Sequence, residues 1–215
     1  MDSLIFGIFQ FAILIFSVII HEVSHGYAAE RLGDPTARLA GRLTMNPIPH
    51  IDLFGSVILP LLFFLTNSPI LLGWAKPVPY DPRNLRDQRY GPLKVALAGP
   101  ASNILLFLIF GLAARLGAGV ALSPELIALF SLIALLNVSL AVLNLIPIPP
   151  LDGSKILFLF LPQRYVYMIE RAGMSGIFLV LIFLMFFSWV IPTISGIGFY
   201  LVAGPEAIAA LNSVF

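Results

Sequence analysis

The sequence predicts an all-α polytopic membrane protein. Of its 215 residues, 59% are hydrophobic and only 11% are charged, whereas a soluble domain carries about 25% charged residues. The mean hydropathy is +0.99, and the apolar residues fall into five or six segments separated by short polar stretches. So little polarity cannot coat a globule in water, and the apolar surface therefore faces lipid. We expect residues 1–215 to form a single domain in the bilayer.

The apolar segments differ in length and continuity. A helix needs about 20 apolar residues to cross a bilayer, and four segments meet or approach that length. The segment over 51–66 is shorter and contains Pro60. The tail over 193–215 is interrupted by glycines and by Pro205, which leaves its path open. In chain order the segments cover residues 4 to about 31, 51–66, 93–116, 125–146, 174–191 and 193–215.

The basic residues predict the orientation, because Lys and Arg are retained on the cytoplasmic side of a membrane. All of the 12 Lys and Arg residues except Arg115 fall within 31–42, 76–94 and 155–171. We therefore expect the N-terminus outside and these three stretches inside. The chain is expected in the cell membrane, with any active site near the cytoplasmic side.

One segment, 51–75, conflicts with a simple crossing. Both of its flanks, 31–50 and 76–90, are expected in the cytoplasm, so the chain between them cannot cross once. We predict a re-entrant segment, with a helix over 51–66 and an extended return through 74–80. Irregular backbone at membrane depth is tolerated only against protein or in a water-filled cavity, and a cavity is therefore expected here.

A metal-binding motif lies at the inner end of the first span. Residues 21–25 are His-Glu-Val-Ser-His, and the chain has no Cys. Positions i and i+4 share one face of a helix, so His21 and His25 can reach one ion. Two neutral imidazoles suit Zn²⁺, and Glu22 is placed to act as general base. The alternative is a hydrogen-bonded polar helix end, but ionisable groups in a span are costly and usually functional.

A catalytic zinc site takes three protein ligands and a water. The candidates for the third ligand are Glu30, His50, Asp52 and Asp152. Glu30 lies on a different helical face from His25, and Asp52 has an ordinary explanation as a charge at a helix N-terminus. Asp152 follows a full span and three prolines, where a cation would offset the cost of a carboxylate; its alternative is a helix N-cap. We therefore expect one Zn²⁺ per chain, held by His21, His25 and Asp152.

The H-E-x-x-H motif at residues 21–25 is followed much later in the chain by Asn144-x-x-Pro and then by Leu-Asp152-Gly. Together these motifs resemble the signature of the site-2 protease family of intramembrane zinc metalloproteases. By that resemblance His21, His25 and Asp152 bind zinc and Glu22 activates water. Four further stretches resemble the compact branch of that family, which lacks PDZ and CBS domains: residues 33–37, 41–47, 73–79 and 98–103.

Two asparagines, Asn144 and Asn103, lie within apolar spans. Each is predicted to bind a substrate backbone or the oxyanion of the tetrahedral intermediate, where one donor contributes about 3 kcal/mol. The alternative is hydrogen bonding between helices, and for Asn103 the two interpretations are balanced. Gly99 and Pro100 are expected to permit close packing of helices.

The resulting hypothesis is metal-assisted hydrolysis of peptide bonds in transmembrane or membrane-associated substrates, as in regulated intramembrane proteolysis. Residues 38–44 and 74–80 are expected to form a small membrane-associated β element whose edge pairs with an unwound substrate. A metal transporter would spread its ligands over several spans, and a non-catalytic adaptor would have no need of the base Glu22. The net charge of +1, with no clustered basic face, gives no indication of nucleic-acid binding.

Overall fold

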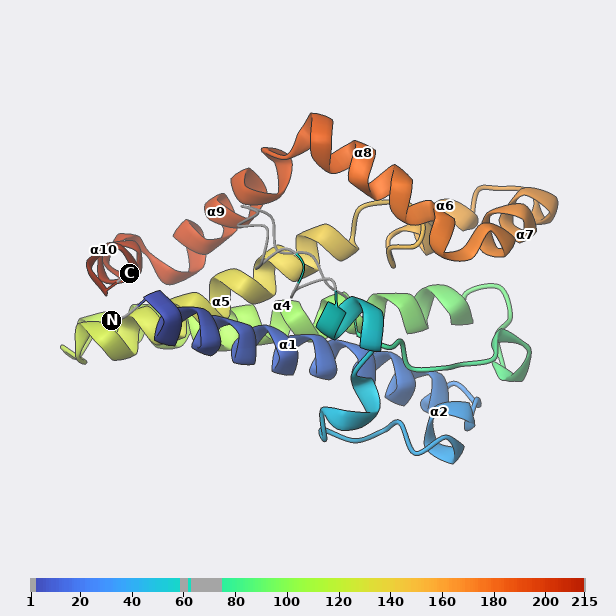
Figure 1. Cartoon of the computed structure of the whole chain (residues 1–215), viewed down its shortest axis with the longest axis horizontal. Helices are drawn as coiled ribbons and strands as arrows, with labels where there is room; N and C mark the ends of the chain where they lie inside the picture. The colour runs from blue at the N-terminus through green and yellow to red at the C-terminus, as the bar shows by residue number, and fades with distance from the viewer. Residues whose placement is uncertain (1–2, 59–61, 63–74, 215) are drawn as a thin grey trace.

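The computed structural model describes residues 3–58, 62 and 75–214. Every regular element within these ranges is helical, and these ranges contain no strand. Three of the described helices are long and apolar enough to cross a membrane: α1 (Ser3–Arg31), α4 (Gly91–Gly119) and α5 (Pro124–Asn144). They run side by side, with α4 packed against both of the others and antiparallel to them (Figure 1). The prediction that the chain is all-helical is confirmed for the described residues, with three candidate spans among them.

Local sequence explains where α5 begins. Ser123 is the N-cap, and its side chain accepts a hydrogen bond from the backbone amide of Leu126. Pro124 occupies the first helical position, where its missing N–H leaves no bond unmade. Glu125 follows in the first turn, where a carboxylate interacts favourably with the helix dipole. The N-terminal end of α5 is therefore fixed by ordinary helix-start chemistry.

The expected span over 174–191 lies in a bent pair of helices that together are long and apolar enough to cross a membrane. α8 (Ile177–Phe187) and α9 (Val190–Ala203) meet at 71° and form an arch over α5 (Figure 1). Pro192 accounts for the break, because it has no N–H to donate to the carbonyl of Ser188 four residues earlier.

The C-terminal tail, whose path the sequence left open, is also helical. α9 continues through the first two glycines of the tail and ends at Ala203, and its C-cap is Gly204, whose φ is +85°. Pro205 then begins α10 (Pro205–Val214). This glycine stop and proline start follow the usual preferences of helix ends.

Short helices lie along the chain between the long helices. α2, α6 and α7 lie toward the end of the molecule at which α1 ends and α4 begins (Figure 1). The short elements are α2 (Thr36–Leu39), η1 (Ile48–His50), the π-helical η2 (Leu53–Ile58), η3 (Pro82–Asn84), α6 (Ser154–Phe158), α7 (Gln163–Ala172) and η4 (Gly173–Gly176).

The expected β element is not formed by the described residues. Part of 38–44 lies in α2, and residues 75–80 are extended without a strand partner. Instead of a ladder, the buried side chain of Arg42 donates from Nη2 to the carbonyl of Lys76 at 2.7 Å and to that of Pro77 at 3.3 Å. A side-chain clamp thus takes the place of backbone pairing. Trp74, the first residue of the expected strand, lies outside the described residues.

The two ends of the segment predicted to re-enter lie side by side. The backbone amide of Lys76 donates to the carbonyl of His50 at 2.8 Å. His50 and Lys76, which flank residues 51–75, therefore lie next to each other. The described start of this segment forms η2, and the rest of the predicted excursion, over 59–61 and 63–74, lies outside the described residues.

A buried carboxylate connects the end of α1 to the extended chain before α4. Asp34 accepts hydrogen bonds from the amide of Thr36 at 3.1 Å, the amide of Asp81 at 2.6 Å and the side chain of Asn84 at 3.0 Å. Burial disfavours the ionised form, but a hydrogen bond from the Thr36 hydroxyl together with these three outweighs it, and the pKa of the Asp34 carboxyl lies below its ordinary value. This connection fixes the path of residues 75–80 over α1.

Candidate metal centre

Three of the predicted site residues converge on one point. His21 and His25 project from the same face of α1, with their Nε2 atoms 2.9 Å apart. The Oδ2 atom of Asp152 lies 3.1 Å from His21 Nε2 and 3.3 Å from His25 Nε2. The side chains of His21, His25 and Asp152 are 7%, 12% and 20% exposed, respectively. The structure therefore brings together the two histidines of one span and a carboxylate more than 120 residues later in the chain.

A tight turn carries Asp152 to the histidines. α5 ends at Asn144, and the amide of Gly153 returns to the Asn144 carbonyl at 2.7 Å. A Cβ atom at Gly153 would lie 2.6 Å from the carbonyl oxygen of Ile146, so the turn requires glycine. Gly153 is also the N-cap of α6, and no side chain of the described residues caps that helix. The Asp152 carboxylate is thus not used as a cap, which removes the alternative explanation for this residue.

The chemistry of these three side chains fits a divalent cation. His25 Nδ1 lies 2.8 Å from the carbonyl oxygen of Val95, which only accepts, so Nδ1 carries the proton and Nε2 presents a lone pair. Asp152 Oδ2 is buried, and no group in the described part of the chain donates a hydrogen bond to it. Around a tetrahedral Zn²⁺ with bonds of about 2.0–2.1 Å, ligand atoms lie about 3.3 Å apart. The observed separations of 2.9–3.3 Å are close to that spacing.

The other carboxylate and imidazole candidates for the third ligand lie elsewhere. Glu30 pairs with Arg38, with 2.6 Å between Oε1 and Nε. His50 Nε2 faces a backbone carbonyl at 2.9 Å, and Asp52 accepts a hydrogen bond from a backbone amide of η2 at 2.7 Å. Among the described residues, the group that could hold a metal ion contains Asp152 and none of these three.

Glu22 is held by the extended chain that crosses α1. One of its carboxylate oxygens, Oε2, accepts a hydrogen bond from the amide of Val78 at 2.9 Å. Val78 lies between Pro77 and Pro79, so its amide is the one backbone donor of that tripeptide. Arg42 holds the carbonyl of Pro77. The predicted base Glu22 is thus oriented by the Val78 amide, in a backbone segment that Arg42 in turn holds by a hydrogen bond.

The two predicted substrate-binding asparagines have protein partners. Asn144 Nδ2 donates to the carbonyl of Leu140 on its own helix at 3.0 Å. Asn103 has both ends of its amide engaged, Oδ1 by His21 Nδ1 at 2.6 Å and Nδ2 by the side chain of Asn137 at 2.9 Å. Direct contact of Asn144 and Asn103 with substrate stays a prediction.

Similarity to known proteins identifies the family. Residues 113–188, which contain Asn144 and Asp152, match the model of peptidase family M50. The chain is 38% identical over 176 residues to YwhC of Bacillus subtilis, which is provisionally named a zinc metalloprotease. That alignment covers 78% of this chain and 77% of YwhC. The chain belongs to peptidase family M50. This M50 protein is therefore a zinc metalloprotease, and its apolar helices make it a membrane protein.

Two longer relatives align with this chain over part of their own length. The M50 protein is 30% identical over 181 residues to Rip2 of Mycobacterium tuberculosis, provisionally named a zinc metalloprotease, covering 84% of this chain and 66% of Rip2. It is 24% identical over 188 residues to the zinc metalloprotease MJ0392 of Methanocaldococcus jannaschii, covering 86% of this chain and 44% of that protein. No solved structure matches the M50 protein.

Gly99 allows α4 of the M50 protein to approach the ligands, as expected from its place in the span. A Cβ atom at this position would lie 2.6 Å from His21 Cε1 and still closer to His25 Nε2. We predict that Gly99→Ala displaces an imidazole and weakens zinc binding by about 10–100-fold, the range found when the surroundings of a metal ligand are disturbed. Competition with a chelator on the purified protein measures this.

The matched control is Gly119→Ala, at the end of the same helix. No described atom lies within 4 Å of a Cβ atom at Gly119. Alanine favours a helix over glycine by up to about 1 kcal/mol, so this variant should bind zinc like the parent. Equal affinities of the two alanine variants would contradict the steric role of Gly99.

Sequence reasoning did not single out three residues near this site. Asn137 carries the same signal as the two predicted asparagines, an amide within an apolar span, and could have been found by it. The amide of Val78 and the side chain of Arg42 gave no comparable signal, because a proline-rich stretch and an arginine near an interface are both common. Their roles depend on how distant segments pack.

Proposed function

We propose that this M50 protease cuts transmembrane or membrane-associated peptides at the cluster of His21, His25 and Asp152, near the cytoplasmic side of the cell membrane. The observation that carries the proposal is the convergence of these three side chains beside Glu22 at the inner end of an apolar span. A buried site lined by two imidazoles and a carboxylate suits zinc, and its place in the span gives it access to membrane-embedded substrates.

The roles of the residues follow from their chemistry. His21, His25 and Asp152 would hold a Zn²⁺ ion, which would supply a lowered pKa for bound water and polarisation of the scissile carbonyl. Glu22 removes a proton from the attacking water as its oxygen bonds to the carbonyl carbon. It then delivers that proton to the leaving amine when the C–N bond breaks. The Val78 amide keeps the Glu22 carboxylate in place during both transfers.

Substrate binding needs an unwound segment, because a helix hides the carbonyls that must be attacked. Asn144 ends α5 and begins the turn to Asp152, and its carbonyl accepts a hydrogen bond from the amide of Gly153. We propose that Asn144 contacts the substrate backbone there. The re-entry of residues 51–75 is part of the same proposal, and the meeting of His50 and Lys76 supports it.

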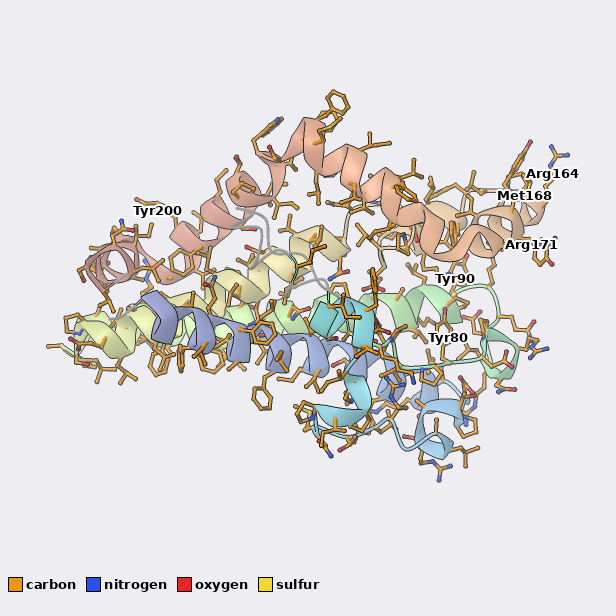
Figure 2. The ribbon with its side chains drawn as sticks, viewed as in Figure 1. Tyr80, Tyr90, Arg164, Met168, Arg171 and Tyr200 are labelled. Atoms are coloured by element: carbon orange, nitrogen blue, oxygen red, sulfur yellow. The ribbon has the colours of Figure 1, made fainter. Side chains whose placement is uncertain are left out.

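The distribution of charge supports a cytoplasmic site. α1 ends, and α4 begins, toward the end of the molecule at which α2, α6 and α7 lie (Figure 1). Arg164 and Arg171 lie at that end, and Tyr200 lies toward the other (Figure 2). Because basic residues are retained in the cytoplasm, we propose that the C-terminal end of α1, the helix that carries both histidines, faces that compartment.

This orientation gives a direct prediction. Arg86 is exposed, and the chain has no native Cys to confuse labelling. A cysteine at Arg86 should resist an impermeant thiol reagent applied to intact cells and react after the cells are opened. A cysteine at Val120, which is 73% exposed in the opposite loop, should react from outside. Labelling of Arg86→Cys in intact cells would reverse the proposed side.

The catalytic role is tested by proteolysis with and without the base. A co-expressed membrane substrate should be cut by the parent chain, and Glu22→Gln should abolish cutting while zinc stays bound. An adaptor or a metal transporter would keep its binding or its flux after the same substitution, because neither activity needs a general base.

A further inference from the structure

Four buried polar side chains from three spans form one hydrogen-bonded chain that ends on a zinc ligand. Ser17 Oγ lies 2.9 Å from Asn137 Nδ2, Asn137 Oδ1 lies 2.9 Å from Asn103 Nδ2, and Asn103 Oδ1 lies 2.6 Å from His21 Nδ1. Asn103 and Asn137 are fully buried, and Ser17 and His21 are 3% and 6% exposed. Polar groups at such positions depend on one another for their hydrogen bonds.

A backbone carbonyl fixes the direction of this chain. Asn137 Nδ2 also donates to the carbonyl of Ile133 at 2.9 Å, and a carbonyl accepts only. The Oδ1 atom of Asn137 must therefore face Asn103, which answers with Nδ2 as the donor. Asn103 is left with Oδ1 toward His21, so His21 Nδ1 must carry the proton. The lone pair of His21 then lies on Nε2, the atom that faces His25 and Asp152.

The two histidines reach the same tautomer by different means. The backbone carbonyl of Val95 orients His25, and its direction is set by α4 itself. His21 depends on the side chain of Asn103, an amide that would present a donor instead of an acceptor if it turned over. Asn137 prevents this turn, and Ser17 and the carbonyl of Ile133 hold Asn137. His21 is therefore the ligand whose orientation rests on side chains distant from the metal.

We propose that Asn103, Asn137 and Ser17 are positioning residues that set the tautomer and orientation of His21 as a zinc ligand. Outer-shell partners of this kind fix a metal-bound imidazole, and their loss typically weakens metal affinity by about 10–100-fold. The proposal rests on His21 being a ligand, as proposed above. It gives Asn103 a role through His21, distinct from direct contact with substrate.

The test is a double-mutant cycle on zinc affinity, measured by chelator competition on the full chain in detergent. Asn103→Leu and Asn137→Leu should each weaken zinc binding, Asn103→Leu by about 10–100-fold. The double variant should bind zinc no more weakly than Asn103→Leu alone, because Asn137 acts only through Asn103. Additive losses, or wild-type affinity in either single variant, would overturn the proposal.

Nuclear magnetic resonance of the zinc-loaded protein separates positioning from general packing. The chain has three histidines, so ¹⁵N-histidine labelling gives a simple spectrum. Asn137→Leu should shift the Nδ1–H signal of His21 and leave that of His25, which the Val95 carbonyl holds. Equal shifts of both signals would indicate a packing defect and would count against the proposal.

A milder pair keeps the test decisive if the leucine variants do not fold. Ser17 and Ser131 are both buried in spans, and Ser131 contacts the carbonyl of Ala207 outside the chain of amides. Ser17→Ala should shift the Nδ1–H signal of His21 and lower zinc affinity, and Ser131→Ala should change neither. Identical behaviour of the two would overturn the proposal. Zinc binding by the parent chain, and its loss in His21→Ala, tests the ligand assignment separately.

Discussion

Replacing Glu22 by glutamine should lower the rate of substrate cleavage by at least the roughly 10²–10⁴-fold attributed to general-base catalysis. Glutamine keeps the size of the side chain, and its oxygen can still accept the hydrogen bond from the Val78 amide. It lacks the basicity that removes a proton from water. Zinc content should stay at the parent value, because Glu22 is not among the proposed ligands. Cleavage of a co-expressed membrane substrate and zinc analysis of the purified variant measure the two quantities.

The matched control is Glu30→Gln, the same substitution two helical turns farther along α1. Glu30 pairs with Arg38 on the surface, and exposed ion pairs contribute only about 0–1 kcal/mol. This variant should cut substrate at nearly the parent rate. The protease mechanism would have to be abandoned if Glu22→Gln, with zinc bound, cut substrate as fast as Glu30→Gln.

The histidine pair was predictable because its geometry is local. Two residues four apart on a helix share a face whatever the rest of the fold does, so a motif of five residues places two imidazoles side by side. Asp152 was predictable for another reason. The prolines before it end the helix, and a carboxylate at that depth needs a positive partner. The structure adds that Gly153, not Asp152, caps α6.

The features that were not predicted depend on how helices are rotated against one another. A sequence shows that Asn103 and Asn137 lie in apolar spans, but not that they face each other or that Ser17 completes the chain. The expected β element was wrong for the described residues because the Arg42 guanidinium, not a second strand, binds the carbonyls of Lys76 and Pro77. Side chains and backbone compete for the same acceptors, and the sequence does not show which partner prevails.

Removing Asp152 should reduce bound zinc from about one ion per chain to well below one. Asp152→Ala leaves two imidazoles, and a catalytic zinc site takes three protein ligands. The loss should exceed the roughly 10–100-fold that follows removal of an outer-shell partner. The Asp152→Ala substitution also removes the negative charge that offsets the cation in a site of low polarity. Metal analysis of protein purified from zinc-supplied cells, followed by chelator competition, gives stoichiometry and affinity.

Asp52→Ala is the matched control, because Asp52 was a rival candidate and its carboxylate binds a backbone amide of η2. That substitution should leave zinc content unchanged, as should His50→Ala, whose imidazole faces a carbonyl. Parent-level zinc in Asp152→Ala, with loss in His50→Ala, would transfer the third ligand to His50. The geometry argues for loss of zinc in Asp152→Ala, since Asp152 Oδ2 lies within 3.3 Å of both histidine Nε2 atoms. In that arrangement three electron pairs meet in a buried space, and only a cation or shared protons can hold them there.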